Sequence, residues 1–332
     1  MKTLLILLLL FLGGGLACAQ ERVIVDVDYL QEAARRGVIL WDVRNPEDYR
    51  AGHIPGAINI GDFARALRDD NTEDFIAVER IEKSLAAAGL DPAREIVAYG
   101  FRGTWNPYFA RYTMHHFGGR QTRVYHDGVE GWDDAGLRLS RQETKLPPVT
   151  LSLRVNPAVS VSTRDMIARL QRRDIQIIDA RTPAEFAGAD VRAIRGGHIP
   201  GAVNIPYERN WKDPDTPEKL ARGQVTNTSG MSLKPLDQLR ALYSGLDPEK
   251  ETIVYCQSGV RASETAGVLQ QLGFRNVKVY DSSWLGYGNT LDAPANNVTF
   301  FNVEAMNNRI RALQRSIEQL ERELAESKAG KK

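Results

Sequence analysis

Short apolar runs alternate with segments of helical periodicity through most of the chain. The short runs are rich in β-branched residues, as buried strands are, whereas the longer amphipathic segments each end at a glycine, a common helix stop. We predict strands at Val38–Val43 and Ile175–Ala180, and helices at Ala77–Ala88, before Gly89, and at Ala262–Leu272, before Gly273. This alternation predicts βαβ units and therefore an α/β fold of parallel sheets flanked by helices.

The same pattern occurs twice. The sequence Gly-His-Ile-Pro-Gly-Ala stands at Gly52–Ala57 and again at Gly197–Ala202, and an Asp-x-Arg triplet precedes each copy, at Asp42 and at Asp179. Further matches pair Glu95–Tyr99 with Glu251–Tyr255, and Tyr125–Asp127 with Val279–Asp281. The repeat predicts two similar domains, which we place at residues 22–140 and 159–295, with a linker at 141–158 that contains Leu-Pro-Pro.

Residues 300–328 have a different character. Apolar residues recur there at alternating spacings of three and four, as at the a and d positions of a coiled coil. They are Val303, Met306, Ile310, Leu313, Ile317, Leu320 and Leu324. Val or Ile stands mostly at a and Leu mostly at d, which favours a parallel two-stranded coil. The pattern predicts an amphipathic helix that either forms a homodimer through residues 303–324 or lies on its own domain.

Residues 1–19 have the features of a secretory signal. Lys2 precedes the apolar run Leu4–Leu12, and small residues follow up to Ala19. The run is too short to cross a bilayer as a permanent helix. We therefore expect export to the periplasm, with cleavage after Ala19. The alternative is lipidation of Cys18, because Gly15–Cys18 resembles a bacterial lipoprotein signal.

Composition and motifs exclude several kinds of function. The formal net charge is +1, so nothing in the charge balance indicates a nucleic-acid partner. We find neither a Walker-type phosphate loop nor a dinucleotide fingerprint. The adjacent His115 and His116 point in different directions on a helix, and no cysteine or carboxylate completes a metal-ligand spacing with them. We therefore expect no cofactor and no metal.

Cys256 is the residue on which the chemistry is expected to depend. Apart from Cys18 it is the only cysteine, so the exported protein carries a single thiol. It follows the predicted strand Thr252–Tyr255 and precedes the helix at Ala262, at the carboxyl edge of a parallel sheet, where α/β proteins bind ligands. The backbone N–H groups of the loop and the helix N-terminus favour an anion there, and a thiolate is the nearest one. Arg261 adds positive charge.

Together, these motifs resemble a tandem-domain rhodanese of the thiosulfate or 3-mercaptopyruvate sulfurtransferase type, from about residue 22 to residue 295. The resemblance implies that Cys256 takes the outer sulfur of a small-molecule donor, holds it as a persulfide and passes it to a thiophilic acceptor, cyanide or a thiol. It also implies that backbone N–H groups cradle the persulfide, namely those of Gln257, Ser258, Gly259, Val260 and Arg261.

One rival is a cysteine phosphatase of related fold. Those enzymes have one residue more between their Cys and Arg than this chain, in which four residues separate Cys256 from Arg261. The residue after Arg261 is Ala262, which cannot hold an oxyanion. The shorter loop favours a sulfur atom over a phosphate.

The donor is open on these residues. Arg261 resembles the basic loops of thiosulfate users, and on its strength we favour thiosulfate, although Ser258–Val260 resembles the loop of mercaptopyruvate users. In animal two-domain enzymes a donor-binding arginine stands where this chain has Glu185. Arg192 and Arg195 either replace it or belong to a solvated loop. A non-enzymatic persulfide carrier or scaffold is the alternative from another class.

The first domain is expected to be inactive. In an alignment without gaps Tyr99 takes the place of Cys256, and residues 20–255 contain no cysteine. His53 and His198 recur in both copies of the repeat, and so do the Asp-x-Arg pairs. Because one copy lacks the nucleophile, we expect structural roles for these residues.

Overall fold

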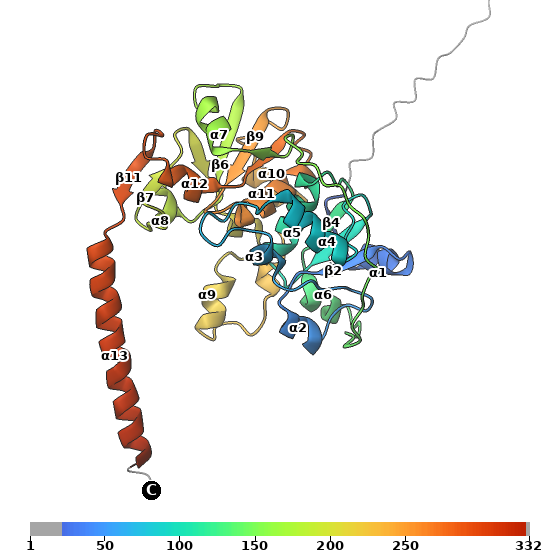
Figure 1. Cartoon of the computed structure of the whole chain (residues 1–332), viewed down its shortest axis with the longest axis horizontal. Helices are drawn as coiled ribbons and strands as arrows, with labels where there is room; N and C mark the ends of the chain where they lie inside the picture. Colours follow the sequence, from blue (N-terminus) through green and yellow to red (C-terminus); the bar gives the residue numbers. More distant parts are fainter. Residues whose placement is uncertain (1–21, 330–332) are drawn as a thin grey trace, which may run out of the picture.

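The computed structural model describes residues 22–329, which form two α/β domains and a long C-terminal helix (Figure 1). The predicted signal segment 1–19, Cys18 included, lies outside the described residues. Within the described part, no helix is both long enough and apolar enough to cross a membrane. The predicted α/β class, with two sheet-and-helix domains, is confirmed.

The first domain is built on a four-stranded parallel sheet in the order β1-β4-β3-β2. Every residue of its two strands β2 and β3 is buried, as expected for a sheet covered on both faces. The strands are β1 (Ile24–Val25), β2 (Ile39–Asp42), β3 (Ile96–Tyr99) and β4 (Thr122–Tyr125). The helices are α1 (Val27–Arg35), α2 (Pro46–Ala51), α3 (Phe63–Ala66), α4 (Val78–Ala87), α5 (Asn106–His116) and α6 (Gly128–Asp134).

The second domain repeats this plan on a five-stranded parallel sheet in the order β5-β10-β9-β6-β8. Its strands are β5 (Ser160–Val161), β6 (Ile175–Asp179), β8 (Ala202–Asn204), β9 (Glu251–Tyr255) and β10 (Val277–Tyr280). Its helical segments are α7 (Thr163–Arg169), α8 (Pro183–Phe186), η1 (Tyr207–Asn210), α9 (Thr216–Ala221), η2 (Ser229–Met231), α10 (Leu236–Leu242), α11 (Val260–Gln271) and α12 (Ser283–Asn289). α11 begins two residues before the predicted Ala262, because Gly259 at φ +81° turns the chain straight into the helix.

The second domain continues past Ala295. β11 (Asn296–Phe300) pairs antiparallel with β7 (Arg195–His198), so the pairing extends past residue 295, where we placed the domain's end. α13 (Val303–Ala329) then projects away from both domains (Figure 1). The predicted helix is present, and its apolar stripe is solvent-exposed: Val303, Met306, Ile310, Leu313, Ile317, Leu320 and Leu324.

The two domains share one hydrophobic core. α5 packs against α11, and Gly267 allows the close approach, because a Cβ there would lie 2.7 Å from a ring carbon of Tyr108. Residues of both domains form a single buried cluster, which includes Phe109 and Met114 from the first and Ala266 and Leu269 from the second. The segment 141–158 is held on the first domain by bonds such as Val149 N–H to the Ala86 carbonyl at 2.9 Å.

The repeated polar motifs brace the strand ends. Arg181 donates to the Asp179 carboxylate at 2.6 Å and to the Gly197 carbonyl at 2.7 Å, and Arg44 makes the same two bonds to Asp42 and Gly52. The repeated histidines hydrogen-bond to carbonyls and stack on aromatic rings: His53 on Tyr49, and His198 on Phe186. The expected structural roles are therefore confirmed.

Candidate active site

Cys256 lies at the carboxyl end of β9, in the middle of the second sheet. Cys256 is 1% exposed, and it is the only cysteine among residues 22–329. The strand is flanked by β6 and β10, so the loop that follows opens at the sheet edge where parallel α/β folds collect ligands. The structure thus places the thiol where the sequence predicted it.

Ser283 hydrogen-bonds to both ends of the Cys256 loop, a role that the sequence did not reveal. Its Oγ accepts from the N–H of Cys256 at 3.1 Å and from the N–H of Gly259 at 2.9 Å, and its hydroxyl donates to the Tyr280 carbonyl at 2.6 Å. Ser283 has φ +48°, which is uncommon for a residue with a side chain. This backbone geometry brings one hydroxyl under both ends of the Cys256–Gly259 turn.

One of the five backbone N–H groups predicted to form the cradle, that of Gly259, is already hydrogen-bonded. The N–H of Gly259 already has its acceptor in Ser283, so it is not available to a sulfur on Cys256. The N–H groups of the other four cradle residues find no acceptor among residues 22–329: Gln257, Ser258, Val260 and Arg261. Unpaired N–H groups at a helix N-terminus attract an anion.

Arg261 is already paired. It donates both guanidinium ends to Glu185, at 2.8 and 2.7 Å, and it is largely buried. Burial disfavours the Glu185 carboxylate, but the bonds from Arg261 prevail and lower the pKa of Glu185 to about 2. Glu185 also completes a capping box with Thr182. The positive charge that the sequence assigned to the loop is thus balanced by the carboxylate that stands in the place of the expected arginine.

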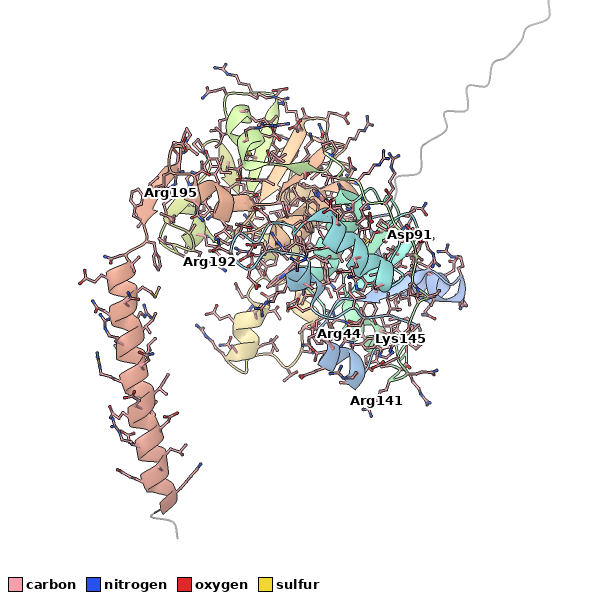
Figure 2. The ribbon with its side chains drawn as sticks, in the orientation of Figure 1. Arg44, Asp91, Arg141, Lys145, Arg192 and Arg195 are labelled. Carbon is pink, nitrogen blue, oxygen red and sulfur yellow. The ribbon has the colours of Figure 1, made fainter. Side chains whose placement is uncertain are left out.

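The two further arginines have different roles (Figure 2). Arg195 is buried and donates to four carbonyls, those of Tyr287, Gly288, Thr290 and Ala293, so it is structural. Arg192 has a half-exposed side chain with one contact, at 3.3 Å to Glu185, and its carbonyl accepts from the Gln257 amide at 2.7 Å. Arg192 is therefore tied to the Cys256 loop, while Arg195 is not.

A cavity of about 310 Å³ opens beside the loop, between the domains. Val260 is its one lining residue from the second domain, and the others come from the first: Asp62, Ala64, Arg65, Arg68, Asp69, Asp70, Glu73, Trp105 and Asn106. Trp105 also packs edge-on against Tyr207 of the second domain, with ring centroids 5.6 Å apart. The first domain thus forms one wall of the cavity.

A family model described as the rhodanese-like domain matches the chain at residues 26–135 and again at 162–290. The chain belongs to the rhodanese-like family. The thiosulfate sulfurtransferase of Corynebacterium glutamicum is 32% identical over 258 residues, which are 74% of this chain and 80% of that protein. The sulfur carrier protein TtuD of Thermus thermophilus is 29% identical and covers 83% of this chain and 97% of its own.

A solved structure agrees. SseA of Escherichia coli, described as a 3-mercaptopyruvate sulfurtransferase with the rhodanese fold, has a TM-score of 0.66 at 27% identity, over 80% of this chain and 99% of its own. The predicted family and the predicted class of enzyme, a sulfurtransferase, are confirmed.

The first rhodanese domain differs from the second at the nucleophile, and here the sequence alignment was off by one residue. Asp42 pairs in register with Tyr99, and Asp179 with Tyr255, so Tyr99 is the counterpart of Tyr255. Each tyrosine hydroxyl accepts from the isoleucine N–H of the repeated hexapeptide. Gly100 therefore stands in the place of Cys256.

The two adjacent histidines are partly buried near the end of α5. Burial lowers the pKa of His115 to about 3 and that of His116 to about 4, so both are neutral at physiological pH. Within residues 22–329 no group of three or more His, Cys, Asp or Glu side chains is arranged to hold a metal ion.

Proposed function

We propose that Cys256 is the nucleophile of a thiosulfate sulfurtransferase. Its thiolate attacks the outer sulfur of thiosulfate, the S–S bond of the donor breaks, and the bonding pair leaves with sulfite. The persulfide on Cys256 is then attacked by cyanide or by a thiolate, and the Cys256 sulfur departs as a thiolate again. Atoms and charge balance without an oxidant or a reductant.

The observation that carries this proposal is the loop itself. A lone thiol stands at a strand end, and the loop that follows it has four backbone N–H groups without an acceptor in the described part of the chain. We infer that these groups stabilise the negative charge of a thiolate or persulfide. The rigid support from Ser283 keeps the N–H groups in place before the reaction. Arg192 has a half-exposed side chain that pairs with Glu185, and its backbone carbonyl is bound to Gln257 of the loop. We propose that its guanidinium receives the sulfonate of the donor.

Turnover tests the proposal directly. Purified protein is incubated with thiosulfate and cyanide, and thiocyanate is followed by its coloured iron complex. Wild type should turn over and Cys256→Ser should not, and intact-mass spectrometry should find one added sulfur atom on wild type alone. Equal rates for the two proteins would exclude Cys256 as the nucleophile.

The same assay distinguishes two alternatives to this function. The Ser258–Val260 segment and the likeness to SseA support 3-mercaptopyruvate as the donor, so kcat/KM is compared for the two donors. The likeness to a sulfur carrier protein supports a carrier, which would take up sulfur from thiosulfate without multiple turnovers. We expect thiosulfate to be the better donor and turnover to continue.

We also propose that the protein acts outside the cytoplasm. The support is the signal-like segment 1–19, with release after Ala19 or an anchor on Cys18. Fractionation of cells that express the full chain, together with the Cys18→Ser variant, tests this. The soluble route predicts that wild type and variant are both found in the periplasmic fraction, whereas lipidation predicts that only the variant is released.

A homodimer through residues 303–324 is proposed on the exposure of α13. The helix is 27 residues long, and its a and d side chains are left uncovered by its own domains. A stripe of this kind on a protruding helix is expected to pair with a copy of itself. Light scattering should give twice the chain mass for residues 20–332 and the monomer mass for residues 20–301.

A further inference from the structure

Another cavity lies between the two domains, at the far end of α11 from the Cys256 loop. It has a volume of about 730 Å³ and is lined by residues of both domains, among them Arg111 of α5 and Gln270 of α11. α11 begins at Val260, so about 15 Å of helix separate the Gln270 end from the Cys256 loop. This cavity is therefore not part of the active site described above.

Three arginines line this space, which we call the arginine cavity, and no carboxylate of residues 22–329 lines it. Arg120 follows α5 and Arg275 follows α11, and both residues are exposed. Arg111 is nearly buried and donates to Gln270 at 2.6 Å, so it links the first domain to the second. Positive charge thus comes to one cavity from both domains.

The two exposed arginines have donors that a ligand can reach. The side chain of Arg120 makes no hydrogen bond or ion pair with the other residues that the structure describes. Arg275 pairs with Glu249 at 3.2 Å, but the two side chains are 78% and 64% exposed, and an ion pair in water contributes little. Neither guanidinium is therefore committed to the fold.

The arginines outweigh the negative charge nearby. α5 ends at His116 and α11 at Gln271, and each helix C-terminus brings about half a negative charge. His115 also lines the cavity but adds no charge, because burial and then the charge of Arg111 lower its pKa to about 3. Three positive charges against two such helix ends leave roughly two, which attracts an anion.

The cavity also has an apolar part. Val23 of the first domain and Val159 and Phe274 of the second line it beside the arginines. Its volume lies within the range of roughly 300–1,000 Å³ that is usual for small-molecule sites. It therefore offers apolar surface to the body of an organic ligand and guanidinium groups to its charges.

We propose that the arginine cavity binds a phosphate-bearing anion with at least two negative charges. A guanidinium donates two parallel N–H bonds to phosphate oxygens, and several guanidiniums together favour a multivalent anion over a single carboxylate. The ligand contacts both domains, so it stabilises the native packing of one on the other. This inference goes beyond sulfur transfer and does not depend on the Cys256 thiol.

Phosphate of this kind has two sources, a free organic phosphate and the headgroup of an anionic phospholipid. The second is relevant because Val23, which lines the cavity, stands five residues after Cys18. A lipid on Cys18 would hold Val23 within at most about 17 Å of a membrane. The experiment therefore has one arm for each source.

In the soluble arm, residues 20–332 are titrated with pyrophosphate, with ADP and with adenosine, which has no charge. Saturating pyrophosphate or ADP should raise the Tm by roughly 2–4 °C, because each binds only the native state, and adenosine should not. In the lipid arm, the same protein is sedimented with vesicles of phosphatidylcholine alone or mixed with phosphatidylglycerol. Binding to the mixed vesicles without a shift by the soluble phosphates would identify the headgroup as the source.

Substitutions assign the binding to the cavity. Arg120→Gln combined with Arg275→Gln should weaken binding roughly tenfold or more, whereas the corresponding pair of lysine substitutions should retain most of it. Arg50→Gln combined with Arg138→Gln changes the net charge equally at exposed sites outside the cavity and should have no effect. Cys256→Ser should bind as wild type does.

Three outcomes would overturn the inference. Neither arm detects binding, or the control pair weakens binding as much as the cavity pair, which would mean attraction by net charge alone. The third is loss of binding in Cys256→Ser, which would place the anion at the active site. Failure of the proposed function is seen separately, as the absence of thiocyanate formation in a protein that still binds phosphate.

Discussion

The loop after β3 in the first domain and the loop after β9 in the second share their positive-φ positions but differ in their side chains and in what holds them. Gly103 and Gly259 both have positive φ, +74° and +81°, and stand at the same distance after Gly100 and Cys256. Below the loops, Gly128 at φ +58° corresponds to Ser283 at φ +48°, since the residue after each donates its N–H to the carbonyl of Gly100 or Cys256. These backbone torsions thus recur in both domains, although only the second carries a cysteine among residues 22–329.

Three positions carry the difference. The nucleophile position holds Cys256 in one loop and Gly100 in the other, and the residue that hydrogen-bonds or packs against the loop is Ser283 or Gly128. The residue directly after β10 is Asp281 and that after β4 is His126, so the match of Asp127 with Asp281 in the sequence was wrong by one residue. A Cβ on Gly128 would lie 2.3 Å from the Gly100 carbonyl oxygen, so the first loop has closed onto its support. A duplicated backbone alone therefore does not make the site, which depends on what the second copy places under and within its loop.

The largest effect is expected from replacing Cys256 with glycine, the residue that the first domain has at the same position (Gly100). Cys256→Gly should reduce thiocyanate formation by at least about a thousandfold, because no other thiol exists among residues 20–332. The unfolding free energy should change far less, which urea titration followed by circular dichroism can verify. Activity within tenfold of wild type would contradict the comparison.

Asp281 should make stability depend on pH in a way that His126 does not. Burial raises the pKa of Asp281 to about 7, although Arg68 opposes this. The native state therefore holds a proton that the unfolded state releases between about pH 4 and pH 7, so the free energy of unfolding falls as pH rises through that range. The side chain keeps 13% exposure, and we expect a loss on the order of 3 kcal/mol.

Asp281→Asn provides the control for this effect. Urea titrations at pH 4.5 and pH 7.5 should find wild type and variant similar at the lower pH, where Asp281 is protonated, and the variant more stable at the higher pH. Glu264, whose pKa burial also raises, is present in both proteins and cancels in the difference. Parallel pH curves would show that Asp281 does not titrate in this range.

A smaller effect is expected from replacing Ser283 with glycine, the residue that the first domain has at the same position (Gly128). Ser283→Gly removes the acceptor of two N–H groups, and an unsatisfied buried N–H costs about 1–3 kcal/mol, although glycine adopts φ +48° more easily than serine. We expect kcat with thiosulfate and cyanide to fall by roughly tenfold, since the cradle loosens, with the thiol itself intact. An unchanged kcat would mean that Ser283 does not position the loop.

No activity is expected from the converse exchange. Gly100→Cys in the Cys256→Ser background should form no persulfide, as intact-mass spectrometry can show, because the surrounding loop differs. Arg102 is bound to Asp127 and Asp134, and a Cβ at Gly100 already meets the Thr104 hydroxyl at 3.0 Å. A sulfur adduct on the introduced thiol would show that the first loop lacks nothing but its nucleophile.

The sequence predicted the architecture well because the same pattern of strands, helices and motifs occurs twice in it. The strands at Ile39–Asp42 and Ile175–Asp179 lie within the predicted runs, and α4 differs from its predicted range by one residue at each end. The shift of α11 to Val260 came from one torsion, that of Gly259, which apolar periodicity does not report. The strand β11 was missed because all its residues are exposed and lack alternation.

The site was only partly predictable. Cys256 and its loop stand out locally, but Glu185 as the partner of Arg261 lies 76 residues away and depends on the meeting of two separate loops. Ser283 depends on a backbone torsion, and Arg68 on the packing of one domain against the other. The single-residue misplacement of Tyr99 could have been avoided, since the match of Glu95–Tyr99 with Glu251–Tyr255 already aligned the two tyrosines.

The core that both domains share has a consequence for how such a duplication persists. α5 and α11 bury each other's apolar faces, so a gene that lost its first half would leave the second with a water-exposed seam and a missing cavity wall. A copy without the cysteine is therefore not free to change without limit in this position. Selection for the reaction of Cys256 therefore also preserves the sequence of the first domain, because the second domain depends on it for its packing.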